Sequence, residues 1–264
     1  MGGRVPHIGT YRRELPVSLE RLYENAIDWE HLPYLHRTTF SQVERIDAGE
    51  WGFRARVWNH PHDERRAFVI ELKLNRDCRR WITSTLEGPG TGTEVWTHAF
   101  STAERQTMIV VDFLVPAASA ERVPKLAEYY QTLYARLYDE DVAMMVGRER
   151  ELDRLRADKP SHFSRSKIIG KVTDIRAHLP LEVELDGSRF KVVEVDGELV
   201  AYSTLCPHRL GPLGEARLEG AVVECPWHGY RFDIRTRKSC SGVACSLLQA
   251  PSIRVDDDGQ VILG

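Results

Sequence analysis

The segment CPHRLGPLGEARLEGAVVECPWHG, residues 206–229, carries the most informative pattern of the 264-residue chain. It contains two short motifs, Cys206-Pro-His208 and Cys225-Pro-Trp-His228-Gly, with sixteen residues between them. Each motif sets one cysteine and one histidine beside a proline or a glycine, which are typical residues of tight loops. Two such loops can hold a metal centre from both sides. The segment therefore predicts a metal site made of two thiolates and two imidazoles.

Two kinds of metal centre fit such ligands. A structural zinc site is the plainer alternative, but zinc fingers usually pair Cys with Cys and His with His within one half of the site. In a Rieske [2Fe–2S] centre two cysteines bind one iron and two histidines bind the other, and the neutral imidazoles raise the reduction potential. The mixed halves and their spacing favour the Rieske centre, with the ligands Cys206, His208, Cys225 and His228.

The residues around this segment predict a small all-β domain, residues 165–264. Short apolar stretches alternate there with turn sequences such as Asp186-Gly187, which is the pattern of closely spaced strands. The domain resembles Rieske domains over this whole range. The strands are expected at 168–175, 181–185, 189–195, 198–203, 221–224, 230–233 and 251–255.

Two positions in the cluster loops indicate which kind of Rieske protein the domain resembles. Respiratory Rieske proteins carry an extra disulfide between the two cluster loops, and the matching positions here are Pro212 and Trp227. The loops therefore resemble those of the soluble Rieske ferredoxins and Rieske oxygenases. Cys240 and Cys245 could pair with each other, but reduced thiols are expected in a protein without a secretory signal.

The N-terminal part of the chain predicts a different architecture, of class α+β. Apolar residues spaced three and four apart predict helices over 17–30 and 121–156. This order of elements, a helix, an antiparallel meander and a long helix, resembles the helix-grip or START (Bet v 1-like) domains, and residues 1–158 would form that domain. The polar residues 157–166 are expected to be a linker. The strands of the meander are expected at 51–58, 67–74, 80–86, 93–100 and 107–115.

Residues 24–36, ENAIDWEHLPYLH, gather an acid and two histidines around a proline. His31 falls four residues after Ile27 on the apolar stripe of the first predicted helix, so it is expected to face inward. Pro33 limits the helix, and a bend there can return His36 toward His31. Two histidines and one carboxylate are the ligands of non-heme Fe(II) oxygenases. A hydrogen-bonded pair of core histidines is the plainer alternative.

A third ligand is expected as an inward-facing carboxylate elsewhere in the chain. Asp141 continues the apolar stripe of the predicted long helix, and burying an unpaired carboxylate is costly. Its partner is therefore a cation, either a metal ion or Arg148 two turns further on. Asp139 and Glu140 fall off the stripe and are expected in solvent.

The segment Glu24-x3-Asp28-x2-His31-x4-His36 resembles the iron motif of the Rieske non-heme iron oxygenases, of the kind found in their alpha subunits. The resemblance implies that His31, His36 and Asp141 bind a mononuclear Fe(II). It also implies that Asp28 is the acid that links an iron-ligand histidine to a histidine of the Rieske cluster, His208 or His228.

Three features depart from that family. The domain order is reversed, because the oxygenases usually place the Rieske domain first. The N-terminal domain is short, and the Glu and Gln that often follow the third ligand are replaced around Val146–Glu149. The reversed order leaves open whether electrons pass within one chain or between the chains of a homotrimer, as they do head to tail in the family.

The implied activity is hydroxylation or demethylation of an apolar or aromatic small molecule with O2. No nucleotide-binding G-x-G-x-x-G motif occurs, so a flavin-dependent NAD(P)H reductase or a ferredoxin would supply the electrons. The alternative is a Rieske electron-transfer protein fused to a non-catalytic START-like ligand-binding domain. In that case Asp28, His31 and His36 would form a structural hydrogen-bonded cluster.

Composition excludes several other classes. The chain is 42% hydrophobic and 28% charged, which is ordinary for a globular protein. Its net charge of -3 gives no basic surface for nucleic acid. No apolar run is long enough to span a membrane, and the N-terminus MGGRVPHIGTYRREL lacks the apolar core of a secretory signal. A cytoplasmic location is expected.

Overall fold

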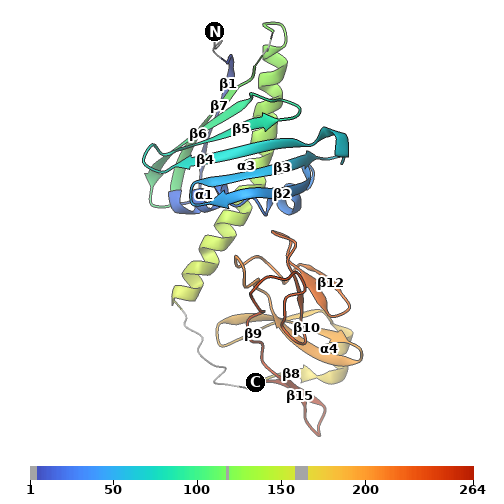
Figure 1. Ribbon diagram of the computed structural model, residues 1–264. Coiled ribbons are helices and arrows are strands. Elements are labelled where there is room, and N and C mark those ends of the chain that lie inside the picture. The colour runs from blue at the N-terminus through green and yellow to red at the C-terminus, as the bar shows by residue number, and fades with distance from the viewer. Residues whose placement is uncertain (1–4, 117–118, 158–165) are drawn as a thin grey trace. The chain divides into compact units, whose positions relative to one another are not determined.

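The boundary between the two halves of the chain falls inside the long helix α3 (Val123–Ala157) (Figure 1). The computed structural model describes residues 5–116, 119–157 and 166–264. By its internal contacts the chain divides into the units Met1–Glu149 and Arg150–Gly264, so the last residues of α3 belong with the C-terminal unit. Most of the predicted linker lies outside the described residues, and the domain limits 1–158 and 165–264 stay a prediction.

The N-terminal unit is built on one antiparallel sheet of seven strands, in the order β1-β7-β6-β5-β4-β3-β2. The five inner strands, β3 to β7, agree closely with the predicted meander, but the edge strands β1 and β2 were not predicted. Both lie at the edges of the sheet, where a strand can carry charged residues on an exposed face. The strands are β1 (His7–Leu15), β2 (Phe40–Gly49), β3 (Gly52–Asn59), β4 (Phe68–Asn75), β5 (Arg80–Glu87), β6 (Glu94–Ala103) and β7 (Gln106–Leu114).

The inner face of this sheet packs against α3 (Figure 1). Along β7, buried residues alternate with partly exposed ones, which is the period of two expected for a strand with one buried face. Ile109, Val111 and Phe113 of β7 are fully buried. Tyr130, Tyr134 and Met145 are among the α3 residues that pack into the same core. The fold class is therefore α+β, with an antiparallel sheet that holds a long helix, as predicted.

Two short helices lie between β1 and β2, and the two predicted histidines flank the second of them. The single helix expected over 17–30 is too long, because the first helix ends at Ala26 and the second begins at Leu32. Pro33 lies in the first turn of the second helix, where its fixed φ favours helix initiation. Pro33 therefore starts a helical turn. The expected bend of a longer helix at this residue is not what the structure has. The two helices are α1 (Leu19–Ala26) and α2 (Leu32–Leu35), and a single 3-10 turn, η1 (Glu64–Arg66), follows β3.

Among its described residues, the C-terminal unit contains three antiparallel sheets of three strands each, in the orders β11-β10-β9, β12-β13-β14 and β15-β16-β8. The strand predicted at 168–175 is wrong in its second half, which forms the helix α4 (Val172–Ala177). Strands β12 and β16 were not predicted. The strands are β8 (Lys167–Lys171), β9 (Leu181–Leu185), β10 (Ser188–Val195), β11 (Glu198–Ser203), β12 (Arg217–Glu219), β13 (Val222–Glu224), β14 (Arg231–Asp233), β15 (Ile253–Val255) and β16 (Gln260–Leu263).

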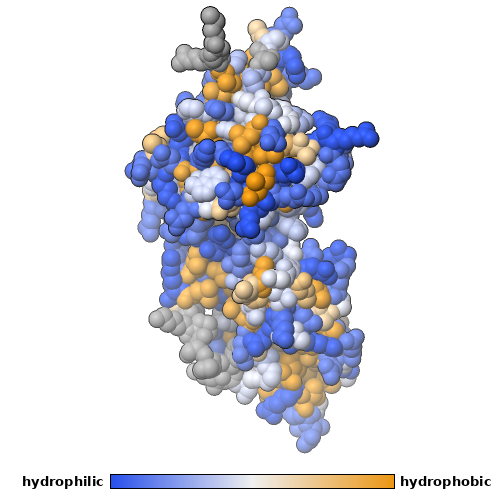
Figure 2. All heavy atoms as spheres, in the orientation of Figure 1, coloured by the Kyte–Doolittle hydropathy of each residue, from blue (hydrophilic) through white to orange (hydrophobic). Residues whose placement is uncertain are grey.

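Both units cover their cores with a mixed surface. Figure 2 shows small apolar patches between larger hydrophilic areas on the face in view. Among the described residues, no helix combines the length and the apolar character that a membrane crossing requires.

Candidate metal centres

The two Cys/His loops of the C-terminal unit repeat one backbone geometry. In each loop the cysteine N–H donates to the carbonyl five residues later at 2.8 Å, and its carbonyl accepts from the N–H four residues later at 2.9 Å. The fifth residue of each loop has a positive φ, 63° at Leu210 and 66° at Gly229. The loops differ in the position of the histidine, which is third in the first loop and fourth in the second.

The two loops meet cysteine against cysteine and histidine against histidine. Cys206 and Cys225 are each 1% exposed, and their thiols share a hydrogen bond, which raises the pKa of Cys206 and lowers the pKa of Cys225. The rings of His208 and His228 lie 4.7 Å apart between centroids and are nearly perpendicular. The Nδ1 atoms of both rings are buried. This arrangement places the two sulfur ligands together and the two nitrogen ligands together.

The space between the loops is narrow and lacks a competing disulfide. A Cβ atom added at Gly211 would stand 2.8 Å from the Cys225 sulfur, so glycine keeps the first loop close to the second. Cys240 and Cys245 are free thiols, with Cys240 exposed and Cys245 half-buried, so neither lies in the core. Two buried thiols beside two imidazoles fit a Rieske [2Fe–2S] cluster in both donor type and pairing.

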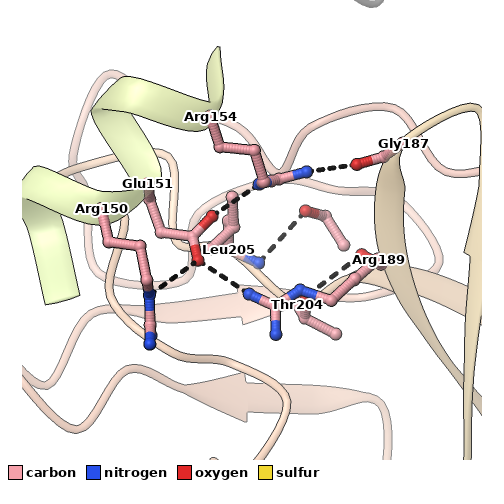
Figure 3. A network of polar contacts seen from close by, with 8 residues as sticks. Arg150, Glu151, Arg154, Gly187, Arg189, Thr204 and Leu205 are labelled. Atoms are coloured by element: carbon pink, nitrogen blue, oxygen red, sulfur yellow. Dashed lines mark hydrogen bonds and ion pairs between the residues drawn. The ribbon is translucent and has the colours of Figure 1, made fainter. Parts of the chain in front are cut away.

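A buried carboxylate also supports the first cluster loop within the C-terminal unit (Figure 3). Glu151 is 4% exposed and forms ion pairs with Arg154 at 2.8 Å and with Arg189 at 2.7 Å. The carbonyl of Arg189 accepts hydrogen bonds from the backbone N–H and the hydroxyl of Thr204, both at 3.1 Å. Thr204 lies two residues before Cys206, so the last turns of α3 reach the start of the cluster loop through two contacts.

In the N-terminal unit, His31, His36 and Asp141 form a buried cluster in which one possible ligand atom of each lies within 4.8 Å of the others. The Asp141 Oδ1 atom lies 3.0 Å from Nε2 of His36 and 3.5 Å from Nε2 of His31. The histidines flank α2, whose single turn holds their rings 5.0 Å apart, and Asp141 comes from α3. The structure thus brings together three residues that are far apart in the sequence.

Glu140 holds the outer side of this cluster. Its Oε2 atom lies 2.6 Å from Nδ1 of His36, so His36 has one carboxylate at each ring nitrogen. We had expected Glu140 in solvent, and that expectation is wrong, because the side chain turns back toward α2 and is only 27% exposed. A carboxylate bonded to the far nitrogen of a metal-binding histidine fixes its tautomer and orientation.

Two further polar residues complete the surroundings. The amide of Asn25 donates to Asp141 Oδ1 at 3.0 Å, and the Oδ2 atom of Asp28 lies 3.9 Å from Nδ1 of His31. Asp28 is 7% exposed, so the acid singled out in the sequence is buried beside a candidate ligand. Asn25 was not predicted, because α1 carries several other polar residues and nothing local distinguishes this one.

The electrostatics of the cluster favour a cation beside a carboxylate. Burial raises the pKa of Asp141, but the hydrogen bond and charge of His36 outweigh burial, so the net pKa is lowered. Burial lowers the pKa of His36, but the bonds to Asp141 and Glu140 outweigh burial, so the net pKa is raised. Two imidazole nitrogens and an ionised carboxylate are donors that suit a ferrous ion.

The competing explanation for Asp141 is excluded by the position of Arg148. The Nε atom of Arg148 donates to Glu24 at 3.0 Å, which ties α3 to α1. The described contacts of Asp141 are instead with the two histidines and Asn25. Asp139 is 66% exposed and pairs with Arg13 at the surface, as its position off the helix stripe predicted.

The family and sequence comparisons concern the Rieske domain of the C-terminal unit. Residues 166–247 match the Rieske [2Fe-2S] domain family. The ferredoxin component of a naphthalene 1,2-dioxygenase system from Pseudomonas putida is 35% identical over 81 residues, which are 30% of this chain and 78% of that protein. The biphenyl dioxygenase ferredoxin subunit of Pseudomonas sp. (strain KKS102) is 36% identical over 77 residues, which are 29% of this chain and 71% of that protein.

Solved structures resemble each part of the chain. Norcoclaurine synthase from Thalictrum flavum aligns with 52% of this chain and 84% of its own, at 17% identity and a TM-score of 0.41. The ferredoxin of carbazole 1,9a-dioxygenase from Nocardioides aromaticivorans IC177 aligns with 38% of this chain and 97% of its own, at 24% identity and a TM-score of 0.33. The sequence relatives, together with the paired cysteine and histidine loops, establish that this chain belongs to the Rieske [2Fe–2S] family through its C-terminal domain.

Proposed function

We propose that the protein is a Rieske-type oxygenase. A [2Fe–2S] cluster bound by Cys206, His208, Cys225 and His228 would supply electrons, and a mononuclear ferrous ion would use O2 to hydroxylate or demethylate an apolar or aromatic small molecule. The observation that carries the proposal is the buried cluster of His31, His36 and Asp141. Three ionisable groups seldom share a buried site unless a cation or a hydrogen-bond network compensates them.

The ferrous ion would supply O2 activation, because three protein ligands leave coordination positions open. Hydroxylation of a C–H bond inserts one oxygen atom and releases the other as water, which requires two electrons and two protons besides O2. A Rieske cluster transfers one electron at a time, so an external donor must reduce it twice for each turnover. A flavin-dependent NAD(P)H reductase or a ferredoxin would be that donor.

Asp28 would link the Rieske cluster to the iron site and so couple electron transfer between the two centres. Its carboxylate is buried and lies 3.9 Å from Nδ1 of His31, at the ring nitrogen that faces away from Asp141. An approach from this separation to hydrogen-bond distance would let it accept the Nδ1–H of His31 and keep Nε2 of that ring available as a ligand. Its second partner would be His208 or His228, either of the same chain or of a neighbour in a homotrimer.

A second candidate function is electron transfer alone, with the N-terminal domain as a non-catalytic binding module. The two sequence relatives reported above favour this candidate, because one is the ferredoxin component and the other the ferredoxin subunit of a dioxygenase. In this candidate Asp28, His31 and His36 form a structural hydrogen-bonded cluster, and no second metal binds. The two candidates therefore differ in what the N-terminal domain binds.

Iron content separates the two candidates. The full chain would be reconstituted with iron and sulfide without oxygen, desalted, and assayed for iron and for the spectrum of nitric oxide bound at a ferrous site. The oxygenase predicts about three irons per chain, two in the cluster and one in the triad. Asp141→Asn should lose the third iron and the nitric oxide signal, whereas Asp139→Asn, its exposed neighbour, should keep both. Two irons and no ferrous signal in the wild type would refute the oxygenase.

A further inference from the structure

The last turns of α3 carry a buried carboxylate that lies outside the part of the chain matched by the Rieske family. That match begins at residue 166, whereas Glu151 lies within α3 and is 4% exposed. Burying an ionised carboxylate is costly unless charged or hydrogen-bonding groups compensate it. The partners of Glu151 therefore indicate what its burial achieves.

Two arginines compensate Glu151 and connect it to one turn of the C-terminal unit (Figure 3). Its Oε1 atom lies 2.7 Å from Nη2 of Arg189, the second residue of β10, and its Oε2 atom lies 2.8 Å from Nε of Arg154. Arg154 in turn donates from Nη1 to the carbonyl of Gly187, in the turn between β9 and β10. The end of α3 therefore holds both this turn and the start of β10.

The backbone of Arg189 extends this restraint to the first cluster loop. Its carbonyl accepts hydrogen bonds from the N–H and the hydroxyl of Thr204, both at 3.1 Å. The carbonyl of Thr204 accepts a hydrogen bond from the N–H of Leu213 at 2.7 Å, where the chain has left the loop. Both ends of the loop that carries Cys206 and His208 therefore meet at Thr204.

We propose that Glu151 is a positioning residue of the Rieske cluster. Through Arg189 and Thr204 it fixes the first cluster loop, and thereby the orientation of the His208 ring. Groups that orient the ligands from outside tune the reduction potential of a metal centre. The inference needs only the Rieske cluster, which both candidate functions share, so it does not depend on the oxygenase.

The charge of Glu151 is a second way in which this residue can affect the cluster, and the sign of the effect separates the two. A reduced cluster carries one more electron than an oxidised one. Glu151→Gln removes a negative charge, which by itself favours the reduced cluster, whereas Arg189→Gln removes a positive charge and by itself favours the oxidised cluster. A loss of positioning is common to both variants and shifts the potential in one direction.

The test measures the reduction potential of the cluster and the EPR spectrum of its reduced form in the full chain. We expect Glu151→Gln and Arg189→Gln each to change the ratio of reduced to oxidised cluster at a fixed applied potential about threefold, in the same direction. The double variant should shift no further than the larger single change, because both residues act through one contact.

Two sets of controls accompany these variants. Asp153→Asn removes an acid of the same helix whose ion-pair partner, Arg156, also lies on α3 at 3.6 Å, and it should leave the potential and the spectrum unchanged. Thr204→Val removes the hydroxyl bond to Arg189 without changing any charge and should shift both readouts. Thr204→Ser keeps that hydroxyl and should behave like the wild type.

Opposite shifts in Glu151→Gln and Arg189→Gln, or additive shifts in the double variant, would show that charge acts alone and would overturn the positioning role. A wild-type potential in Glu151→Gln would overturn it as well. If Glu151→Gln failed to assemble the cluster, the Thr204 variants would decide, and a wild-type potential and spectrum in Thr204→Val would refute the inference.

Discussion

The contact between Glu140 and His36 gives the sharpest test of the N-terminal site. Replacing Glu140 by alanine removes a carboxylate that lies 2.6 Å from Nδ1 of His36. A hydrogen bond to a charged group contributes about 1.5–3 kcal/mol, and the lower end applies because Glu140 is 27% exposed. About 1.5 kcal/mol corresponds to a loss in metal affinity of roughly tenfold, which agrees with the usual effect of such partners on metal sites.

The assay is a titration of the site with Co²⁺, whose visible bands report ligand geometry, in competition with a chelator. Glu140→Gln keeps a neutral acceptor, so we expect a loss of only about threefold, between wild type and Glu140→Ala. The matched control is Asp139→Ala, which removes an exposed carboxylate one residue away and should leave the affinity unchanged. If Glu140→Ala bound Co²⁺ within twofold of this control, Glu140 would not position His36.

Three further predictions concern other parts of the chain. Asp28→Asn should keep both metal centres but slow product formation relative to cluster reduction at least tenfold in single-turnover experiments, and unchanged coupling would remove Asp28 from the electron route. Gly211→Ala should reduce cluster content, measured by iron and by visible absorbance, because its Cβ would meet the Cys225 sulfur at 2.8 Å. The control for that loss is Gly220→Ala, because nothing lies within 4 Å of a Cβ added there. The positive φ of Gly220 costs this control some stability. The pKa of Glu71 is lowered by hydrogen bonds to Lys73 and Arg54 from its usual 4.5, so this carboxylate stabilises the fold above about pH 4.5 and ceases to do so as the pH falls. Glu71→Gln should therefore flatten the acid side of the stability curve, and an unchanged curve in urea unfolding between pH 3 and pH 6 would contradict this assignment.

The sequence contained most of what defines the two candidate metal centres. The Cys/His loops are local motifs, so their residues and spacing predict both the ligand set and the way the loops face each other. Asp141 was found from helical periodicity, because a carboxylate on an apolar stripe needs a buried partner. The inner strands and α3 were found because their apolar residues repeat at the periods of a half-buried strand and helix.

The remaining features depend on tertiary contacts that no local pattern reports. Glu140 lies on the polar side of α3, and only the return of α2 toward that side brings His36 within reach of its carboxylate. The chain leaves α1 at Ile27, although the apolar spacing continued to His31. The edge strands β1 and β2 gain their partners from the sheet and not from their own polar sequences.

Three consecutive acids of α3 have three different surroundings. Asp139 is at the surface with Arg13, Glu140 contacts the outer nitrogen of His36, and Asp141 lies between the two histidines. Neighbouring residues of a helix point about 100° apart. One inserted or deleted residue between Val123 and Tyr138 would therefore rotate each of the three carboxylates away from its present partner. The first half of α3 therefore has a fixed length as well as a fixed composition, and homologous chains that keep the triad should show no gap there.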